Sequence, residues 1–463
     1  MFPLLLLIIL IPFLSGLIIM ATPKNLIKLV QISSSVITLL LSLLLVWSFI
    51  TSTSLFSNSI TFSYLGFPVG FQVTQISLIL VLMSSIVFTA SSIGVGYFIK
   101  DNLKIYGVLF ALIEGSSIAL FLSSNLLLLY VFWEMAEFSM FFIIYMYGSS
   151  RKRYAAIKFI IYSLISSLFL LIAILLLYSG ITPNTFQISQ IIATSGTIPV
   201  SLQELILIFL LISFMIKIPI FPFHNWLPDA HTEAPTTGSM ILAGVLLKFG
   251  GYGLILTSLM LPIFKTYSLY LAAIFIISSL YSVFVAIKQT NLKRIIAYSS
   301  ITDMAIVSLG IATGTSLGVQ GALYGMLSHA ISISMLFLIA GTLSEVYGSL
   351  DLSVLKGVIK NFSSLAYLFI AGTFATVGIP LTAGFIADVL IFTAAFTTFG
   401  LVSFVPLISI IILGAMLFWV IERVFLSNKS KPINILLNSV LYSEVFLLSA
   451  SVILGVLPAL LIH

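Results

Sequence analysis

Long runs of apolar residues recur from the start of this chain to its end, and no soluble fold could bury so many of them. Hydrophobic residues make up 60% of the 463 residues, and charged residues only 7%. A helix of roughly 20 apolar residues crosses a hydrocarbon layer about 30 Å thick, because lipid offers the backbone no other hydrogen-bond partners. We therefore predict an all-α polytopic membrane protein.

The apolar runs predict about fourteen transmembrane helices. They lie at residues 2–20, 29–51, 75–98, 105–123, 125–147, 156–179, 203–221, 237–262, 268–287, 292–312, 318–344, 362–395, 402–424 and 435–461.

The positive charge predicts how these helices are oriented. Of the nineteen Lys and Arg residues, one (Lys265) falls on one side of the membrane and two (Lys217 and Lys248) fall inside it. The other sixteen share the opposite side: Lys24, Lys28, Lys100, Lys104, Arg151, Lys152, Arg153, Lys158, Lys288, Lys293, Arg294, Lys356, Lys360, Arg423, Lys429 and Lys431. By the positive-inside rule that side is cytoplasmic, so both termini lie outside. The basic pI near 9.3 thus reflects topology and does not indicate a nucleic-acid partner.

Two predicted helices are broken by proline at corresponding places. Ile216–Phe223 interrupts the seventh span, and Val377–Phe385 interrupts the twelfth, five helices later. Such breaks are tolerated at membrane depth where the backbone is buried or lines a hydrated cavity, and paired breaks are typical of transporters built from repeats. We predict a single membrane domain, residues 1–463, with helices 1–3 (1–104), two inverted five-helix repeats (105–262 and 268–424) and a last helix (435–463).

Ionisable residues inside the predicted spans are the strongest functional signal. They are Lys217, Lys248, Glu114, Glu134, Glu137, Asp303, His329, Asp388 and, near the end of the chain, Glu444. Each costs on the order of 3 kcal/mol to insert, and a single buried pair could serve only to hold two helices in register. Their number favours a relay of proton or ion sites that faces a common hydrated interior.

The chemistry of these groups suits protons. A lysine beside a carboxylate can hold or release its proton, and a histidine can relay a proton between its two ring nitrogens. Glu134 and Glu137 are three residues apart, so they share one helix face and compete for one proton.

A metal site is the less favoured alternative. His224, His231, Asp229 and Glu233 could act as ligands, but their spacing matches no standard zinc pattern. We expect loop structure there, or a cap for the eighth span, and no metal. The Gly250–Gly253 run predicts close helix packing. The chain contains no cysteine, so redox chemistry must lie on another chain.

Several motifs resemble those of the antiporter-like proton-pumping subunits of respiratory complex I, the chain M type (chain 4 in mitochondria). They are Phe132-Trp-Glu134-Met135, Lys217-Ile-Pro219, Phe221–Ser239, Leu242–Leu254, Asn291–Ser300, Leu327-Ser-His329-Ala330 and Gly378–Phe385. The match covers most of the chain, and its long central motif is highly specific.

The resemblance implies a role for each matching residue. Glu134 corresponds to the family's carboxylate on the fifth span and Lys217 to its partner. Lys248 is the central lysine, His329 the histidine of the eleventh span and Glu114 a second acid on the fourth. Two residues depart from the family: Asp388 replaces a terminal Glu or Lys, and Asp303 replaces a histidine.

The resemblance also implies partners and a location. We expect quinone, flavin and iron–sulfur clusters on partner subunits and no cofactor on this chain. The expected partners are other membrane subunits, including further antiporter-like ones, and the lipid bilayer. The expected location is a prokaryotic cytoplasmic (inner) membrane, with the mitochondrial inner membrane as the alternative.

Other functions remain open. The same superfamily includes subunits of multisubunit sodium/proton antiporters and of membrane-bound hydrogenases, in which Na⁺ could replace H⁺ as cargo. A structural membrane anchor with an inactive channel is disfavoured by the retained Glu134, Lys217, Lys248, His329 and Asp388.

Overall fold

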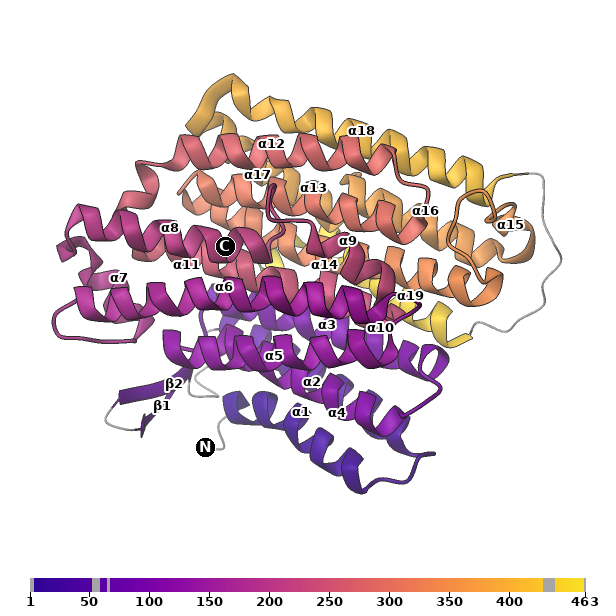
Figure 1. Ribbon diagram of the computed structural model, residues 1–463, viewed down its shortest axis with the longest axis horizontal. Helices are drawn as coiled ribbons and strands as arrows, with labels where there is room; N and C mark the ends of the chain where they lie inside the picture. Colours follow the sequence, from indigo (N-terminus) through magenta and orange to yellow (C-terminus); the bar gives the residue numbers. More distant parts are fainter. Residues whose placement is uncertain (1–3, 52–58, 65–66, 428–437, 462–463) are drawn as a thin grey trace.

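The computed structural model describes residues 4–51, 59–64, 67–427 and 438–461. The helix axes are roughly aligned with one another, with the chain running up some helices and down others, and together they form a single bundle (Figure 1). Within this described part, thirteen helical runs are long and apolar enough to cross a membrane, and Ser363–Val377 is a shorter apolar helix. The run Ala383–Phe425 holds two helices that fold back at a 3₁₀ turn, so about fourteen spans result, as predicted.

The first half of the bundle agrees with the predicted spans to within a few residues. Its helices are α1 (Leu4–Ala21), α2 (Ile27–Ile50), α3 (Gln75–Phe98), α4 (Leu103–Leu122), α5 (Leu126–Tyr147), α6 (Lys152–Gly180), α8 (Val200–Lys217), α9 (Trp226–Glu233), α10 (Thr236–Ile241) and α11 (Leu247–Met260). A π-helical turn, η2 (Leu242–Leu246), joins α10 to α11.

The second half follows the same pattern. Its helices are α12 (Ser268–Ile287), α13 (Leu292–Ala312), α14 (Ser316–Tyr347), α15 (Val358–Asn361), α16 (Ser363–Val377), α17 (Ala383–Phe399), α18 (Val405–Val420) and α19 (Asn438–Val456). Shorter turns are η1 (Ser195–Thr197), η3 (Pro262–Lys265), η4 (Gly400–Phe404), η5 (Ile421–Phe425, π-helical) and η6 (Pro458–Leu460).

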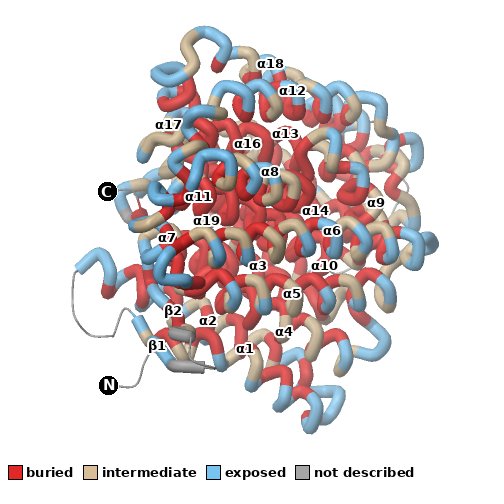
Figure 2. The backbone as a smooth tube through the Cα atoms, turned by 60° about the vertical axis from the view of Figure 1, so that its left-hand side comes forward, coloured by how far each residue is buried: buried red, intermediate tan, exposed pale blue. Residues whose placement is uncertain are grey.

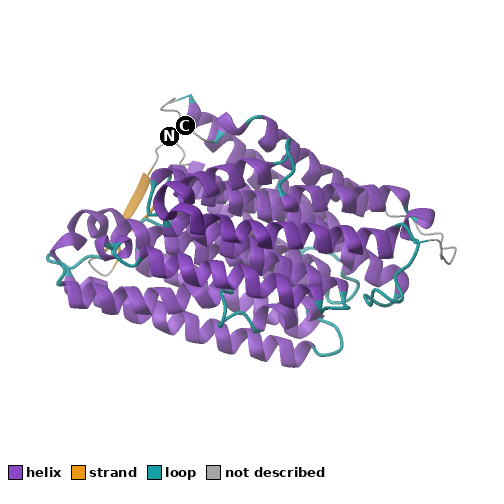
Figure 3. Cartoon of the chain, turned by 90° about the horizontal axis from the view of Figure 1, so that it is seen from above, coloured by secondary structure: helices purple, strands orange, loops and turns teal. Residues whose placement is uncertain are grey.

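Two elements add to the predicted helices. An antiparallel hairpin, β1 (Ser59–Tyr64) and β2 (Phe67–Gln72), lies at one end of the bundle (Figures 1 and 3). The short helix α7 (Ile188–Thr194) lies at the same end. Both lie in the polar stretches that separate predicted spans.

The centre of the bundle is formed by α11 and α14, which neighbouring helices surround (Figure 2). The apolar stretches of Thr236–Met260, which includes α11, and of α14 are completely buried, whereas α1, α2 and α18 keep long exposed apolar faces. The glycines near Lys248 explain the close packing. A Cβ on Gly250 would lie 2.7 Å from Ile218, and one on Gly253 would lie 2.2 Å from the Phe214 ring. The predicted close helix contact is therefore confirmed.

Both predicted breaks are present, and hydrogen bonds from side chains or within the turn satisfy backbone groups at each break. In the first, between α8 and α9, the Trp226 indole donates to the Ile216 carbonyl (2.9 Å), and the Phe221 amide donates to Ser278 Oγ (3.0 Å). The second, between α16 and α17, turns at Gly378 with φ of +73°. The first break is largely buried, whereas Pro380 and Leu381 in the second are exposed on the surface of this chain.

The positive charges gather at the end of the bundle opposite the hairpin. Lys28 donates to the Gly96 carbonyl, Lys104 to the Met20 carbonyl and Lys100 to Glu345, and each contact joins helix ends on that side. Helices α1 and α19 respectively begin and end near the hairpin (Figures 1 and 3). Lys429 and Lys431 lie outside the described residues. The two ends of the bundle therefore differ strongly in charge, and we call them the basic end and the hairpin end.

Candidate functional site

A buried ion pair lies where α8 breaks. Lys217 is the last residue of α8, and its Nζ contacts Glu137 Oε1 on α5. Both side chains are 1% exposed. The resemblance predicts Glu134 as the partner of Lys217, and this pairing is wrong. Positions 134 and 137 share one broad face of α5, but only Glu137 faces the bundle interior, whereas Glu134 is turned toward α6.

Glu134 occupies the half-buried border between α5 and α6. Its carboxylate interacts with Tyr130 on its own helix and with Ser167 on α6, and it feels the charges of Glu137 and Lys217. One oxygen, Oε1, has no hydrogen-bond partner within the described part of the chain. The two acids therefore form a pair of acceptors near a single lysine, one inside the bundle and one at its edge.

Three aromatic rings surround the Lys217 ammonium group. The centroids of Trp133, Phe159 and Phe249 lie 5.7, 5.6 and 5.8 Å from its Nζ. The rings come from α5, α6 and α11 and therefore enclose the ammonium on several sides. A ring face attracts a desolvated cation by about 2 kcal/mol. The rings thus help to offset the cost of burying this charge in a dry place.

The second lysine, Lys248, is held by neutral groups at a helix irregularity. Its Nζ donates to the Ala243 carbonyl (2.6 Å) within the π-helical turn η2. A π turn lengthens the backbone hydrogen-bond spacing and makes a carbonyl accessible to a side chain, which is why such turns recur at functional sites. The same Nζ lies 2.6 Å from His329 Nδ1 on α14.

The other nitrogen of His329 extends this contact. Nε2 lies 2.9 Å from the Ser300 hydroxyl on α13. When the lysine is charged and donates to Nδ1, the ring proton is on Nε2 and points to Ser300. Lys248, His329 and Ser300 therefore form a continuous hydrogen-bonded chain across three helices, of the kind through which a histidine can pass a proton from one ring nitrogen to the other.

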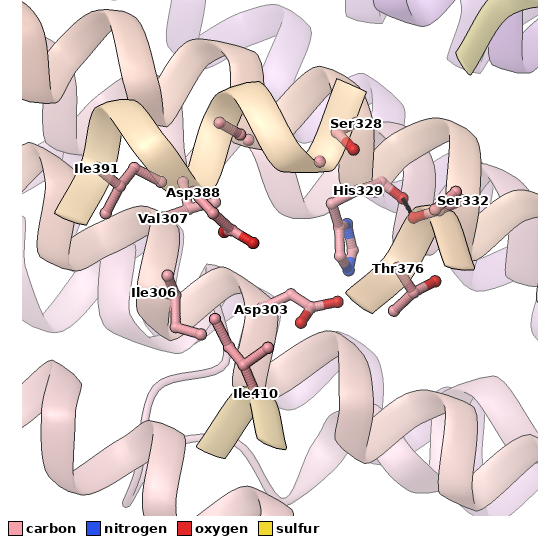
Figure 4. Close-up of a pocket in the computed structure, with 14 residues that line it drawn as sticks. Asp303, Ile306, Val307, Ser328, His329, Ser332, Thr376, Asp388, Ile391 and Ile410 are labelled. Atoms are coloured by element: carbon pink, nitrogen blue, oxygen red, sulfur yellow. Dashed lines mark hydrogen bonds between the residues drawn. The ribbon is translucent and has the colours of Figure 1, made fainter. Parts of the chain in front are cut away.

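Asp303 and Asp388 face a common cavity with His329 (Figure 4). The cavity has a volume of about 40 Å³ and is also lined by Ser328, Ser332 and Thr376. Each carboxylate influences the ionisation of the group beside it: Asp388 acts on Asp303, and Asp303 acts on Lys248. A cavity of this size, lined by hydroxyls and carboxylates, has room for a few water molecules.

The second helix break places Asp388 in that cavity. Gly378 ends α16, and a Cβ at this position would lie 2.5 Å from Asp388 Oδ2. Gly384 begins α17 against Ser328 and the carbonyl of Ala375. The backbone can approach the carboxylate this closely only because Gly378 has no side chain.

The predicted residues thus fall into two groups. Glu134, Glu137 and Lys217 form the first, and Lys248, Asp303, His329 and Asp388 form the second. The groups meet where Gly250, two residues from Lys248, packs against the Cβ atom of Lys217 and the backbone amide of Ile218.

Two other predicted acids lie apart from both groups. Glu114 on α4 is 1% exposed, and Ser35 donates to its Oε2 (3.0 Å). Glu444 on α19 is completely buried, and neither carboxylate oxygen has a partner among the residues described.

The alternative metal ligands have other roles. Asp229 accepts from Lys158 (2.7 Å) and Arg294 (2.5 Å), and Glu233 accepts from Ser149 and the Arg151 amide. His224 and His231 lie beside aromatic rings. His224 lies in the turn that precedes α9, as the expected loop structure requires, whereas His231 lies within helix α9. Across the described ranges, no three His, Asp or Glu side chains gather as metal ligands would.

Sequence reasoning missed the aromatic rings around Lys217 and the hydroxyl groups of Ser332 and Thr376 in the cavity. Trp133, Phe159 and Phe249 look like ordinary core residues in the sequence, because only the fold brings them to one ammonium group. Ser332 and Thr376 carry no pattern that separates them from other membrane hydroxyls.

Comparison with known proteins reveals a clear family relationship. Residues 123–417 match the family described as "NADH:quinone oxidoreductase/Mrp antiporter, TM". The chain is 37% identical over 393 residues to NADH-quinone oxidoreductase subunit M of Rickettsia felis, which covers 83% of this chain and 79% of that protein.

Solved structures share the fold. A chain of respiratory complex I from Thermus thermophilus superposes with a TM-score of 0.90 at 24% identity, covering 98% of this chain and 96% of that one. A chain of the Mrp complex from Dietzia sp. DQ12-45-1b gives a TM-score of 0.87 at 18% identity, covering 99% and 95%. At these identities the structural likeness concerns the fold alone.

Proposed function

Because this chain belongs to the family of antiporter-like membrane subunits of NADH:quinone oxidoreductase, of the subunit M or chain 4 type, we propose that it moves protons across the membrane through the two groups of buried ionisable residues. The chain is a multi-pass membrane subunit of this respiratory complex. In our proposal the electron-transfer chemistry takes place on other subunits.

The contact between Lys248 Nζ and His329 Nδ1, at 2.6 Å, carries this proposal. A structural ion pair would join opposite charges, whereas this contact joins two groups that both take up and release protons. Since a charged lysine next to a neutral imidazole donates along the line of transfer, the arrangement suits proton exchange better than helix fixation.

The route we propose runs from the first group to the second. Lys217 exchanges its proton with Glu137 or Glu134. When Lys217 releases this proton, positive charge can move on to Lys248. Lys248 passes a proton to His329, which releases it to Ser300 or to water in the cavity shared with Asp303. Asp388, at the second helix break, is the last carboxylate on the route. Glu114 serves as a further acid on the side of α4.

The wider assembly follows from the same proposal. Further antiporter-like subunits and the quinone, flavin and iron–sulfur chemistry lie on partner chains. The basic end faces the cytoplasm of a prokaryotic cell, and both termini face outward.

The alternative function is that of a cation/proton antiporter subunit. The fold that this chain shares with a chain of the Mrp complex is compatible with that function. Its cation would bind at the paired carboxylates Asp303 and Asp388, where the cavity has oxygen ligands of the kind that Na⁺ prefers. Replacing Na⁺ by choline in the transport assay separates the two functions, because only the antiporter loses activity.

Proton uptake by the assembled complex in liposomes tests the proposal. We expect Lys248→Ala to abolish the proton flux linked to this subunit while complex yield is unchanged. Lys265→Ala, which alters the single lysine at the hairpin end, is the matched control and should pump normally. Normal pumping by an assembled Lys248→Ala complex would refute the relay.

A further inference from the structure

The inward face of α2 is polar, which is unusual for a helix at the edge of a membrane bundle. Its buried residues include Gln31, Ser34, Ser35, Thr38 and Ser42, whereas its exposed face is formed by leucine, isoleucine and Trp47. Small hydroxyl residues often serve only close packing, and two of these hydroxyls, those of Thr38 and Ser42, do bond to carbonyls of their own helix. Gln31 and Ser34 do not fit that explanation.

Four buried polar atoms, three on this face of α2 and one on α4, lack hydrogen-bond partners within the described part of the chain. They are Oε1 and Nε2 of Gln31, Oγ of Ser34 and Oε1 of Glu114. Gln31 is 2% exposed, Ser34 5% and Glu114 1%. More than nine in ten buried polar groups in proteins are satisfied, so four open atoms together indicate a missing ligand.

Helix register places these atoms along one seam. Helices α2 and α4 run in the same direction, because Ile27 lies beside Gly107 and Ser35 donates to Glu114. Gln31 and Ser34 therefore face the turns of α4 that precede Glu114. On the other side of the seam, Lys28 bonds to the Gly96 carbonyl and Thr89 bonds to the Ser35 carbonyl, so α3 runs antiparallel to α2.

The seam leads inward from the basic end. Lys28 is exposed there, Gln31 lies about one turn deeper and Ser34 and Ser35 lie about one turn deeper again. Glu114, in the middle of α4, is the last group on this line. Of the four open atoms, Nε2 of Gln31 is a donor, Oε1 of Gln31 is an acceptor, the Ser34 hydroxyl can do both, and Oε1 of Glu114 is a carboxyl oxygen. Water satisfies such a mixed set, because each buried water makes about three hydrogen bonds.

We propose that Gln31, Ser34, Ser35 and Glu114 enclose a hydrated site, and that ordered water in it exchanges protons between the Glu114 carboxyl group and the basic end. The inference rests on the proposed function only in treating Glu114 as a relay group. It assigns that group its own access to water, separate from the groups around Lys217 and Lys248.

Infrared difference spectroscopy of the assembled complex in D₂O tests the site. The carbonyl band of protonated Glu114 is identified by its loss in Glu114→Gln, and the rate of its shift on deuteration is then measured. We expect Gln31→Leu and Ser34→Ala each to slow this exchange by roughly tenfold, since each removes one polar partner of the water. Ser33→Ala is the matched control, because Ser33 lies on the exposed face of the same helix and bonds only to Leu29 and Val30 carbonyls.

Each outcome decides the question. Unchanged exchange in both Gln31→Leu and Ser34→Ala would overturn the proposal, as would the absence of any Glu114 band, which would indicate an ionised carboxylate with a bound cation. If Gln31→Leu fails to assemble, the smaller change Ser34→Ala carries the test. Slowed exchange together with normal pumping in Lys248→Ala would leave this site standing and refute the proposed relay alone.

Discussion

The two buried lysines meet the cost of burial in different ways. Lys217 contacts the Glu137 carboxyl group and has three aromatic rings around it, whereas Lys248 contacts the Ala243 carbonyl and the His329 ring, with the carboxyl group of Asp303 acting on it without a direct contact. The two lysines thus have unlike surroundings, and they lie close together, because Gly250, two residues after Lys248, packs against Lys217. This arrangement suits a transfer of charge between them. A purely structural role would not require the second lysine to contact a titratable ring.

Glu137 gives the first prediction at this scale. Replacing Glu137 by Gln removes the partner of a buried charge, which costs about 3–5 kcal/mol if Lys217 stays charged. We expect the proton flux to fall strongly and assembly to weaken. Glu134→Gln is the comparison, and it should preserve assembly while reducing the flux less, since Glu134 is half-buried and not the direct partner. Proton uptake and complex yield are measured in the same vesicles. Equal effects of the two changes would contradict the pairing.

Asp303 gives the second prediction. Asp303→Asn should block proton uptake about as strongly as Lys248→Ala and leave complex yield unchanged, because an amide cannot accept the proton that reaches the cavity. Restoring the histidine of related proteins at this position should be tolerated.

The control for Asp303 lies outside the membrane. Hydrogen bonds from Ser353 lower the pKa of Asp351 below its ordinary value, and its Oδ1 accepts from the Ser353 amide (2.8 Å). Asp351→Asn keeps an acceptor there, so it should pump normally. Loss of assembly in Asp303→Asn would show that this residue holds α13 in place instead of relaying protons.

At the scale of the element, the broken helices place charged groups where continuous helices could not. The break after α8 leaves Lys217 at a helix end, and the break between α16 and α17 brings the backbone of Gly378 against Asp388. In both, side chains from neighbouring helices or the turn itself satisfy the backbone groups that the break exposes. The breaks are therefore built features of the site.

Gly378 provides the test at this scale. Gly378→Ala adds a Cβ 2.5 Å from Asp388 Oδ2, at a residue with φ of +73°, where an L side chain costs about 1–2 kcal/mol. We expect proton uptake to fall well below half of the unmodified rate.

Gly348→Ala separates backbone strain from the clash. Gly348 has φ of +68°, but a Cβ there would meet nothing within 4 Å among the described residues. It should therefore share the small loss of stability, measured as thermal stability of the complex, and keep its proton flux. A similar loss of flux in both variants would mean that strain, and not contact with Asp388, is responsible.

At the scale of the whole molecule, the bundle separates a basic end from the hairpin end. The ion pairs Lys100–Glu345, Lys158–Asp229 and Arg294–Asp229 all lie at the basic end, and they join helices that are far apart in sequence. The charged residues at the basic end therefore also hold helix ends together through these ion pairs.

Topology is the prediction at this scale. A periplasmic reporter fused after His463 should be active, and one inserted in the Arg151–Arg153 loop should be inactive, because the positive-inside rule places that loop in the cytoplasm. A cytoplasmic reporter should show the reverse pattern at both positions. A C-terminus found in the cytoplasm would contradict the model of an even number of spans with outward termini.

The sequence by itself determined the fold class, the number of spans and both breaks. Lipid requires each crossing segment to be a long apolar helix, and only proline and glycine interrupt one, so these features are visible locally. It also singled out the buried ionisable residues, since each is costly in an apolar run. The two inverted repeats stay a prediction from the paired breaks.

Only the tertiary structure decided which groups meet. Whether Glu137 or Glu134 contacts Lys217 depends on how α5 is rotated about its axis relative to α8. Hydrophobic periodicity does not reveal this rotation, because α5 is apolar on all of its faces. The rings around Lys217 come from three helices, and the open atoms near Glu114 depend on the register of α2 against α4. Contacts between distant segments arise from side-chain packing throughout the bundle, so they appear only when the whole chain is folded.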